Sequence, residues 1–334
     1  MTETRQIRIT DVARHASVSQ ATVSRVLNGD ARVGVAYRRR VLRSVEELGY
    51  RPNRLAQNLR RQRTATIGVV VSDIENPHFT ETVRAIEDYA YERGYRVLVC
   101  NTDESSAKQR AYLEMLAEER VLGVILSPSD AQGSEIGALL DVGIPLVALD
   151  RRVDDPRADT VTAANLKAAR TAVGHLVAAG HRKIAFVGGR CDVESGRERL
   201  DGFELEMRNR GLEPRTVVGE FRIDAAENAI ADVLVEHDGP TALIVGNNLM
   251  TIGVLRAIRA NAIRVPEDIA LLAFDDPPWA ELIDPPLTTL AQPVRAMATE
   301  AMELLLERVN ATRTQPRRTV HPFELRVRLS CGTR

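Results

Sequence analysis

Four side chains that can form directional hydrogen bonds lie close together near the start of the chain. They are the hydroxyls of Thr22 and Ser24, the guanidinium of Arg25 and the amide of Asn28, all within the stretch ATVSRVLNGD (21–30). A guanidinium can bridge the O6 and N7 acceptors of guanine, whereas short hydroxyl and amide side chains reach phosphate oxygens. The stretch therefore indicates a helix whose outer edge suits contact with nucleic acid.

The flanking residues predict a helix-turn-helix that would hold this edge in place. In ITDVARHASVSQATVSRVLNGD (9–30), Thr10 or Asp11 can cap a first helix. Ser17 and Val18 form the turn, and Ser19 caps the second helix. The inward positions are apolar at helical spacing, namely Val12, Ala13, Ala16, Val23, Val26 and Leu27. A second helix presented in this way can enter the major groove of DNA.

Charge is distributed unevenly along the 334 residues. The net charge is only −1, yet residues 1–63 contain 14 arginines and no lysine against five acidic residues, a charge of +9. The remainder of the chain carries −10. A cationic end on an otherwise acidic chain is typical of a protein that binds polyphosphate through that end.

Two further basic segments follow the helix-turn-helix. An apolar stripe of Val41, Leu42, Val45 and Leu48 predicts a third helix that closes a headpiece at 1–52. Arg38, Arg39 and Arg40 lie where contacts with the DNA backbone would add salt-dependent binding. Residues 53–63 are rich in arginine and poor in apolar side chains, so we expect a hinge helix or linker that orders only on DNA, against a second copy.

From residue 64 the pattern changes to short β-branched runs that alternate with amphipathic stretches. A first set of apolar runs predicts strands at 66–72, 95–100, 122–127 and 144–150, with helices at 79–94 and 108–121. A second set predicts strands at 183–189, 241–247 and 268–276, with helices at about 165–180, 197–211, 224–237 and 248–262. This rhythm favours two α/β lobes with parallel sheets and a cleft between them.

Polar loops follow several of the apolar runs. They are SDIENPHF, DRR (150–152), GGRCDVESGRER (188–199), GNN (246–248) and FDDPPW (274–279). Each alone could be a solvated loop that caps a helix. Ligands of open α/β sheets bind beyond the carboxyl ends of the strands, so loops that share this end favour a small-molecule site.

Stretches along essentially the whole chain match the pattern of one family. They are TDVARHASVSQATVSRVLNG, GYRPNRLAQNLR, IGVVVSDIENPHF, LVALDRR, GHRKIAFVGG, RERLDGF, FDDPPWAELIDPPLTTL and ELRVRLSC. The chain resembles the lactose repressor and galactose repressor family of bacterial transcription factors. The resemblance implies a homodimer that binds a pseudo-palindromic operator in double-stranded DNA, under allosteric control by a small-molecule effector.

The family's architecture is an all-α helix-turn-helix headpiece and an α/β two-lobed core that looks like a periplasmic binding protein with parallel sheets. By resemblance the core spans 64–334, with lobe 1 at about 64–162 and 292–320 and lobe 2 at about 163–291 and 321–334.

The resemblance also implies roles for residues that face DNA. The base-reading positions fall on Gln20, Ala21 and Arg25. The phosphate-facing positions fall on Ser19, Thr22, Ser24 and Asn28. The hinge and minor-groove positions fall on Asn53, Arg54, Leu55, Ala56 and Leu59, where Leu59 matches the leucine that wedges into the groove and kinks the duplex.

An effector pocket is implied in the same way. Its positions fall on Asp73, His78, Phe79, Asp150, Ser195, Arg199, Asn247, Asp275 and Trp279. Carboxylates, an amide and an arginine fork suit adjacent hydroxyls, and Phe79 or Trp279 can cover the apolar face of a sugar. A sugar is therefore favoured, with sugar phosphates and nucleobases as alternatives. We expect His78 to be an uncharged ring satisfied by hydrogen bonds.

Three positions depart from the family pattern. Ser17 replaces a turn glycine, which costs up to about 1 kcal/mol if the residue has a positive φ. Asn248 stands where an aspartate commonly follows the pocket asparagine, and Ala164 precedes Asn165 where aspartate is usual. We expect these changes to alter details of the pocket entrance and the lobe hinge but not the fold.

Other classes of protein receive less support. The sequence contains no G-x-G-x-x-G after a strand and no Walker A, H-E-x-x-H or G-x-S-x-G motif, so an α/β enzyme is disfavoured and no catalytic residue is expected. Cys100, Cys191 and Cys331 lack paired metal-ligand spacing, so we expect neither metal nor cofactor. An export signal and a membrane-length apolar run are both missing, which disfavours a periplasmic transport protein and predicts a cytoplasmic protein without a membrane partner.

Overall fold

A computed structural model of the chain describes residues 7, 9–27, 32–49 and 64–332. These residues belong to two units, Met1–Arg63 and Thr64–Arg334. The predictions for Asn28 and for the hinge residues Asn53, Arg54, Leu55, Ala56 and Leu59 lie outside the described residues.

The first unit contains the predicted helix-turn-helix and third helix, as α1 (Ile9–His15), α2 (Gln20–Leu27) and α3 (Val35–Glu47). Its core consists of Val12, Ala13, Ala16, Val23, Val26 and Val41. Ser19 caps α2 as expected, because the backbone N–H of Thr22 donates to its Oγ at 3.1 Å. Ser17 has a φ of 50°, so the turn holds a serine in the left-handed conformation that favours glycine.

Two details of this unit were predicted wrongly. Thr10 and Asp11 lie within α1 rather than cap it. The side chain of Leu42 is half exposed rather than part of the buried stripe. With 100° between successive helical residues, Val41 faces the core together with Ser44, whereas Leu42 points away.

The second unit begins with a six-stranded sheet in the order β11-β5-β4-β3-β1-β2, in which every neighbouring pair is parallel. Its strands are β1 (Thr66–Val71), β2 (Arg96–Asn101), β3 (Gly123–Leu126), β4 (Leu146–Leu149), β5 (Asp159–Ala163) and β11 (Arg318–His321). One face packs on α5 (Pro77–Glu92) and α12 (Val294–Val309) and the other on α6 (Ser106–Glu118) and α7 (Ser134–Asp141). We call this sheet and its helices lobe 1.

A second six-stranded sheet has the order β12-β10-β9-β8-β6-β7 and is parallel except for the β10–β12 pair. Its strands are β6 (Ile184–Gly188), β7 (Arg215–Val218), β8 (Ala242–Val245), β9 (Ala270–Phe274), β10 (Thr288–Ala291) and β12 (Glu324–Arg326). One face packs on α8 (Asn165–Ala178) and α9 (Glu194–Asn209) and the other on α10 (Ile223–Leu234) and α11 (Asn248–Ala260). We call this sheet and its helices lobe 2.

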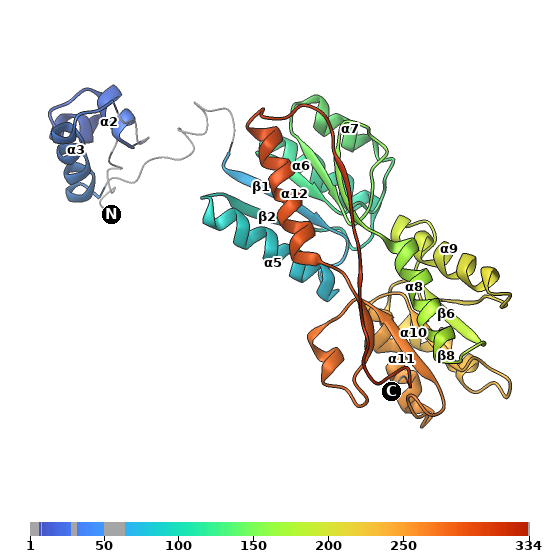
Figure 1. Cartoon of the computed structure of the whole chain (residues 1–334). Coiled ribbons are helices and arrows are strands. Elements are labelled where there is room, and N and C mark those ends of the chain that lie inside the picture. Colours follow the sequence, from blue (N-terminus) through green and yellow to red (C-terminus); the bar gives the residue numbers. More distant parts are fainter. Residues whose placement is uncertain (1–6, 8, 28–31, 50–63, 333–334) are drawn as a thin grey trace, which may run out of the picture. The chain divides into compact units, whose positions relative to one another are not determined.

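The chain passes between the two lobes three times. The crossings lie between β5 and α8, between β10 and α12, and between β11 and β12 (Figure 1). The strands involved stand at one side of each sheet, so β2 and β7 form the edges that are remote from the crossings. The two sheets are therefore hinged along one side.

The sequence pattern identified the long buried strands but missed the short ones. β5, β7, β10 and β11 were not predicted, and neither were α7 and α12. In the final matching stretch, ELRVRLSC, only β12 forms a strand. These short strands contain threonine, arginine or glutamate between their apolar residues, so their periodicity is weak.

None of the helices in the described ranges is long and apolar enough to cross a membrane.

The helices α8 and α9 of lobe 2 pack closely against each other, and this packing can be tested by substitution of glycines. A Cβ atom on Gly202 of α9 would overlap the carbonyl oxygen of Leu166 on α8, whereas a Cβ on Gly174 of α8 would meet only Arg210 Nη2 at 3.3 Å. We expect Gly202→Ala to lower the free energy of unfolding by about 1–3 kcal/mol, because the helices must separate. Gly174→Ala should raise it by up to about 1 kcal/mol through helix propensity. Denaturant unfolding followed by circular dichroism measures both, and equal stability of the two variants would contradict this packing.

Candidate functional site

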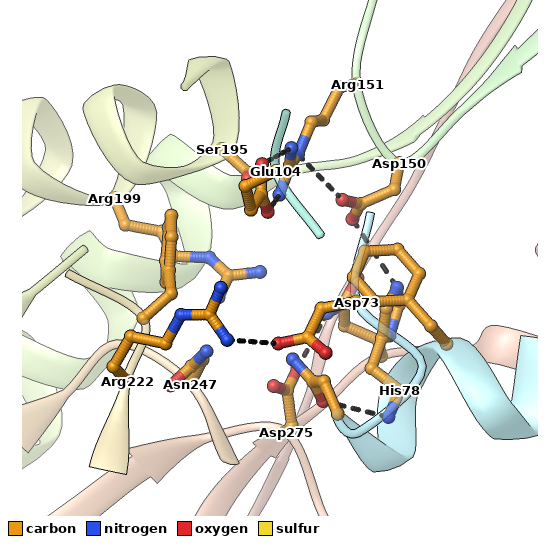
Figure 2. Close-up of a pocket in the computed structure, with 14 residues that line it drawn as sticks. Asp73, His78, Glu104, Asp150, Arg151, Ser195, Arg199, Arg222, Asn247 and Asp275 are labelled. Atoms are coloured by element: carbon orange, nitrogen blue, oxygen red, sulfur yellow. Dashed lines mark hydrogen bonds and ion pairs between the residues drawn. The ribbon is translucent and has the colours of Figure 1, made fainter. Parts of the chain in front are cut away.

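Polar side chains from both lobes converge on one pocket between the two sheets (Figure 2). It has an empty volume of about 450 Å³. Its lining consists of Asp73, Asn76, His78, Phe79, Glu104, Asp150, Arg151, Ser195, Arg199, Phe221, Arg222, Asn247, Asp275 and Gln292. The pocket therefore contains all the residues for which the sequence implied an effector role except Trp279.

Three buried carboxylates reach the pocket from loops that follow parallel strands. Asp73 follows β1, Asp150 follows β4 and Asp275 follows β9, and each is about 5% exposed. Asp150 and Asp275 have φ values of 71° and 68°, a left-handed conformation that aspartate tolerates better than most residues. Such strained backbone occurs preferentially at ligand sites, so it supports a functional role for both residues.

The carboxylates differ in their partners. Asp275 Oδ1 accepts a hydrogen bond from Gln292 Nε2 at 2.6 Å, and its Oδ2 accepts from the backbone N–H of Asn248 at 3.3 Å. Burial raises the pKa of Asp73, although the backbone N–H of Glu75 and the charge of Arg222 act in the opposite direction. The pocket therefore presents carboxylate oxygens as hydrogen-bond acceptors.

Donors in the pocket come mainly from the N-terminal ends of two helices, α9 and α11. Ser195 and Arg199 are one turn apart on the same face of α9. The buried guanidinium of Arg199 donates to Asn165 Oδ1 at 2.8 Å and to the carbonyl of Gly246, and burial lowers its pKa against the opposing charges of Asp275 and Asp150. Asn247 Oδ1 caps α11 by accepting from the N–H of Met250 at 2.8 Å, which leaves its amide nitrogen as a donor.

Arg151 is a second buried guanidinium, held by Glu104 in a bidentate ion pair. Its Nη1 and Nη2 donate to the two carboxylate oxygens of Glu104 at 2.8 and 2.6 Å, and Nη1 also donates to the carbonyl of Pro128 at 3.1 Å. Neither Arg151 nor Glu104 was among the residues predicted to line the pocket. Arg151 belongs to the polar DRR loop, so the sequence contained a signal for its place in the pocket. Glu104 has no such signal, because only the tertiary structure brings it to Arg151.

His78 departs from the expected state. Its Nε2 lies 3.6 Å from Asp150 Oδ1, and its ring meets Phe79 edge to face with centroids 4.9 Å apart. Its Nδ1 is buried and has no hydrogen-bond partner in the part of the chain that the structure describes. The prediction that hydrogen bonds satisfy the ring is therefore wrong for this nitrogen.

Trp279 does not line the pocket, which corrects its implied place there. It lies in a 3-10 helix (Pro278–Glu281) and packs against the lobe 2 core. The second aromatic ring of the pocket belongs instead to Phe221, in the loop after β7. A Cβ on Gly189 would overlap this ring, and a Cβ on Gly196 would lie 3.1 Å from it, so the two glycines make room for Phe221.

The departures from the family pattern have local consequences. Asn248 Nδ2 donates to Asn76 Oδ1 at 3.2 Å, which joins lobe 2 to lobe 1. Ala164 precedes α8 without a side-chain cap. Asn76, Gln292 and Arg222 are further pocket residues that the sequence analysis did not identify.

Of the side chains implied to contact DNA, those of the first unit that the structure describes lie on α2 or directly before it. Gln20, Ala21 and Arg25 are exposed, and Thr22 and Ser24 are half-buried. Ser19 Oγ lies 2.9 Å from Thr22 Oγ1 and also caps α2, so its hydroxyl has local partners. On α3, Arg39 is exposed and the guanidinium of Arg40 lies over the ring of Tyr37 at 5.0 Å.

Within the described ranges, no group of three or more His, Cys, Asp or Glu side chains is arranged to hold a metal ion.

Comparisons with known proteins agree with this arrangement. Residues 8–53 match the model of bacterial regulatory proteins of the lacI family, and residues 173–331 match a periplasmic binding protein-like domain. The HTH-type transcriptional repressor PurR of Aliivibrio salmonicida is 37% identical over 305 residues, which cover 90% of this chain and 92% of the relative.

Two solved structures are similar in fold. The lac repressor dimer bound to operator and the anti-inducer ONPF has a TM-score of 0.87 at 28% identity, over 98% of this chain and 99% of that one. A LacI family transcriptional regulator from Enterococcus faecium with bound ribose has a TM-score of 0.74 at 27% identity, over 79% and 98%.

A helix-turn-helix unit and a two-lobed ligand-binding unit in one chain define the class of DNA-binding regulators that carry a small-molecule domain. The chain belongs to the lacI family of bacterial regulatory proteins. It is a transcriptional repressor with a DNA-binding and a ligand-binding domain, and its relatives are repressors rather than enzymes.

Asp276 lies next to the pocket residue Asp275, and the contribution of its hydrogen bonds to stability can be tested through pH. Burial alone would raise its pKa, but hydrogen bonds from Arg328, Thr289 and Arg326 outweigh this effect and hold the pKa below its usual value. This stabilisation is therefore present above about pH 4 and is lost as the pH falls through the folded-state pKa.

We expect Asp276→Asn to lower the free energy of unfolding by about 1–3 kcal/mol at neutral pH. The difference from the original chain should shrink as the pH falls below about 4. Urea unfolding at several pH values measures it, with Asp201→Asn on the exposed side of α9 as a control. A difference that does not depend on pH would show that charge is not the cause.

Proposed function

We propose that this repressor acts as a homodimer on a pseudo-palindromic operator and is controlled allosterically by a sugar bound between its lobes. The observation that carries the proposal is the pocket, where buried carboxylates, a buried guanidinium and an amide surround a volume of about 450 Å³.

The mixture of donors and acceptors favours hydroxyl groups. Every sugar hydroxyl can donate one hydrogen bond and accept others, so it is matched by a carboxylate on one side and a guanidinium or amide on the other. Asp150 and Asp275 supply acceptors, and Arg199 and Asn247 supply donors. Phe79 and Phe221 offer apolar surfaces for the ring of the sugar. The ribose bound by the Enterococcus faecium relative is a ligand of this class.

Charge disfavours a sugar phosphate. Glu104 neutralises Arg151, and Arg222 contacts the carboxylates of Asp73 and Asp103. The two carboxylates of Asp150 and Asp275 then face the single guanidinium of Arg199. A dianionic phosphate would therefore meet net repulsion. A nucleobase is the second candidate because two aromatic rings line the pocket. Calorimetric titration with pentoses, hexoses, their phosphates and nucleobases tests the proposal, and binding of a phosphate or base alone would overturn the sugar assignment.

For DNA, we propose that α2 enters the major groove. Arg25 reads a base together with Gln20 and Ala21, and Ser19, Thr22, Ser24 and Asn28 contact phosphates. The exposed positions of Gln20, Ala21 and Arg25 support this assignment. The hinge residues Asn53, Arg54, Leu55, Ala56 and Leu59 would contact the minor groove at the operator centre. The protein would act in the cytoplasm, where a bacterial operator lies.

A pseudo-palindromic operator requires two copies of the headpiece. The edge strand β2 leaves Leu98 and Val99 more than a third exposed, which supports pairing of two cores through lobe 1. Effector binding would then shift the population between DNA-competent and incompetent dimers. Whether the effector releases or strengthens DNA binding depends on which of the two states it binds more tightly.

The Arg25 assignment is tested by operator binding. Arg25→Ala should weaken binding to the specific operator by about 1–3 kcal/mol and relax the preference at one base position. Arg39→Ala on α3 should instead weaken binding to all DNA sequences alike and reduce its salt dependence. Fluorescence anisotropy with single-base operator variants measures both effects. Unchanged discrimination in Arg25→Ala would show that the register on DNA is different.

The pocket assignment is tested separately. Asp275→Ala should abolish the effect of the effector on operator binding while sparing operator binding itself, because the acceptor is lost and the headpiece is untouched. Anisotropy with and without the sugar found by calorimetry measures it, with Asp232→Ala on the exposed side of α10 as a control. A response equal to that of the original chain would remove Asp275 from the effector site.

A further inference from the structure

Two loops on opposite lobes touch beside the pocket. Arg222, in the loop between β7 and α10, places its Nη2 2.7 Å from Asp103 Oδ1 and its Nη1 3.6 Å from Asp73 Oδ2. Asp103 follows β2 and Asp73 follows β1, so both carboxylates belong to lobe 1, whereas Arg222 belongs to lobe 2. One guanidinium thus bridges the cleft (Figure 2).

This contact lies where opening of the cleft would move the two lobes furthest apart. β7 and β2 are the edge strands that are remote from the three crossings, which involve β5, β10, β11 and β12 at the other side of the sheets. When hinged lobes separate, the displacement is greatest at the side away from the hinge. The Arg222–Asp103 ion pair must therefore break when the cleft opens.

The two loops share an unusual backbone. Asp103 and Glu104 have φ values of 53° and 57°, and Glu220 and Phe221 have values of 52° and 60°. Each loop thus has two consecutive residues in the left-handed region, and none of the four is a glycine. Strained backbone of this kind is typical of ligand clamps and switch segments, where other contacts hold it in place.

The same loops also contribute to the wall of the pocket. Glu104, Phe221 and Arg222 all line it, and Arg222 is half exposed, with one side towards solvent and one towards the pocket. The Arg222 contact therefore lies at the boundary between the pocket and the solvent.

We propose that Arg222, with Asp103 and Asp73, is an ion-pair latch that keeps the cleft closed and limits how fast the effector enters and leaves. The inference rests on the proposed function and deepens it, because it assigns to the effector pocket a gate in addition to the groups proposed to bind the sugar. Opening of the latch precedes both association and dissociation, so the latch sets the two rates without choosing the ligand.

A second ion-pair cluster across the cleft provides an internal comparison. Arg152, after β4, contacts Glu194 and Glu198 on α9. β4 lies beside the crossing strand β5, so this cluster is nearer to the hinge and needs to change less when the lobes separate. We therefore expect Arg152 to matter less than Arg222 for opening of the cleft.

The first experiment needs no ligand. Hydrogen–deuterium exchange of the full chain follows the loops at 103–105 and 219–222 and the pocket segments at 150–152 and 246–248. Arg222→Gln should speed exchange there about two- to fivefold, the range for an exposed ion pair. High salt should produce the same increase in the original chain but not in the variant.

Matched variants make the result specific. Arg215→Gln removes an exposed bidentate pair with Glu236 in the same lobe, away from the pocket lining, and should leave these segments unchanged. Asp103→Asn should speed exchange by no more than Arg222→Gln, because Arg222 keeps its contact with Asp73, and the double variant should match Arg222→Gln. Equal exchange in Arg222→Gln and the original chain, or additive effects in the double variant, would overturn the latch.

A second experiment measures ligand kinetics with D-ribose as the probe, using surface plasmon resonance on the immobilised full chain. In Arg222→Gln, association and dissociation rates should rise together by about two- to fivefold, so that Kd changes much less than either rate. Faster dissociation with unchanged association would make Arg222 a ligand-contacting residue and overturn the gate. Failure of every sugar in calorimetry would contradict the proposed function, whereas the exchange result in the ligand-free protein tests the latch by itself.

Discussion

The polarity of parallel strands is the constraint on which the pocket depends. In both sheets the carboxyl ends of the strands open towards the other lobe, and the loops that follow them supply the pocket residues. Asp73 and Asp150 follow strands of one sheet and Asp275 follows a strand of the other, yet the three side chains converge because the carboxyl ends of both sheets face the cleft. Residues far apart in the sequence thus meet without any specific interaction that draws them together.

Such convergence concentrates charge in a buried place, and the surrounding residues compensate for it. The Glu104 carboxylate matches the Arg151 guanidinium, and Asn165 and the Gly246 carbonyl accept hydrogen bonds from Arg199. Asp276 points away from its neighbour Asp275, towards Arg326 and Arg328, so two adjacent carboxylates do not compete for the same space. Among the described residues, the buried polar atoms without a hydrogen-bond partner include His78 Nδ1, Arg151 Nε and Gln292 Oε1 of the pocket lining, where a ligand would complete their hydrogen bonds.

The three crossings turn this pocket into a structure that can open. Because they lie at one side of the sheets, motion between the lobes has a defined axis, and contacts across the cleft differ in how much each resists opening. The Arg222, Arg152 and Asn248 contacts join the lobes at different places along the strand order. A ligand that favours the closed arrangement acts in the same direction as these contacts, and this is the energetic basis for coupling a pocket to a second function.

Features that depend on local patterns could be predicted from the amino-acid sequence alone. Helical spacing and the Ser19 cap predicted the helix-turn-helix, and continuous apolar runs predicted the long buried strands. The polar loops after those strands and the family resemblance together pointed to the effector residues, and all of these except Trp279 line the pocket. Leu42 was misplaced because one helical step moves a side chain by 100°, which an apolar composition does not reveal.

Other features depend on tertiary contacts that local patterns do not encode. Glu104, Phe221 and Gln292 enter the pocket only because distant loops meet, and Trp279 leaves it because its ring packs on the lobe 2 core. The short strands β5, β7 and β11 form because neighbouring strands supply their hydrogen bonds, although their own sequences are weakly periodic. In each case the contacts join residues that are distant in the sequence, and their partners are defined only when the two sheets have formed.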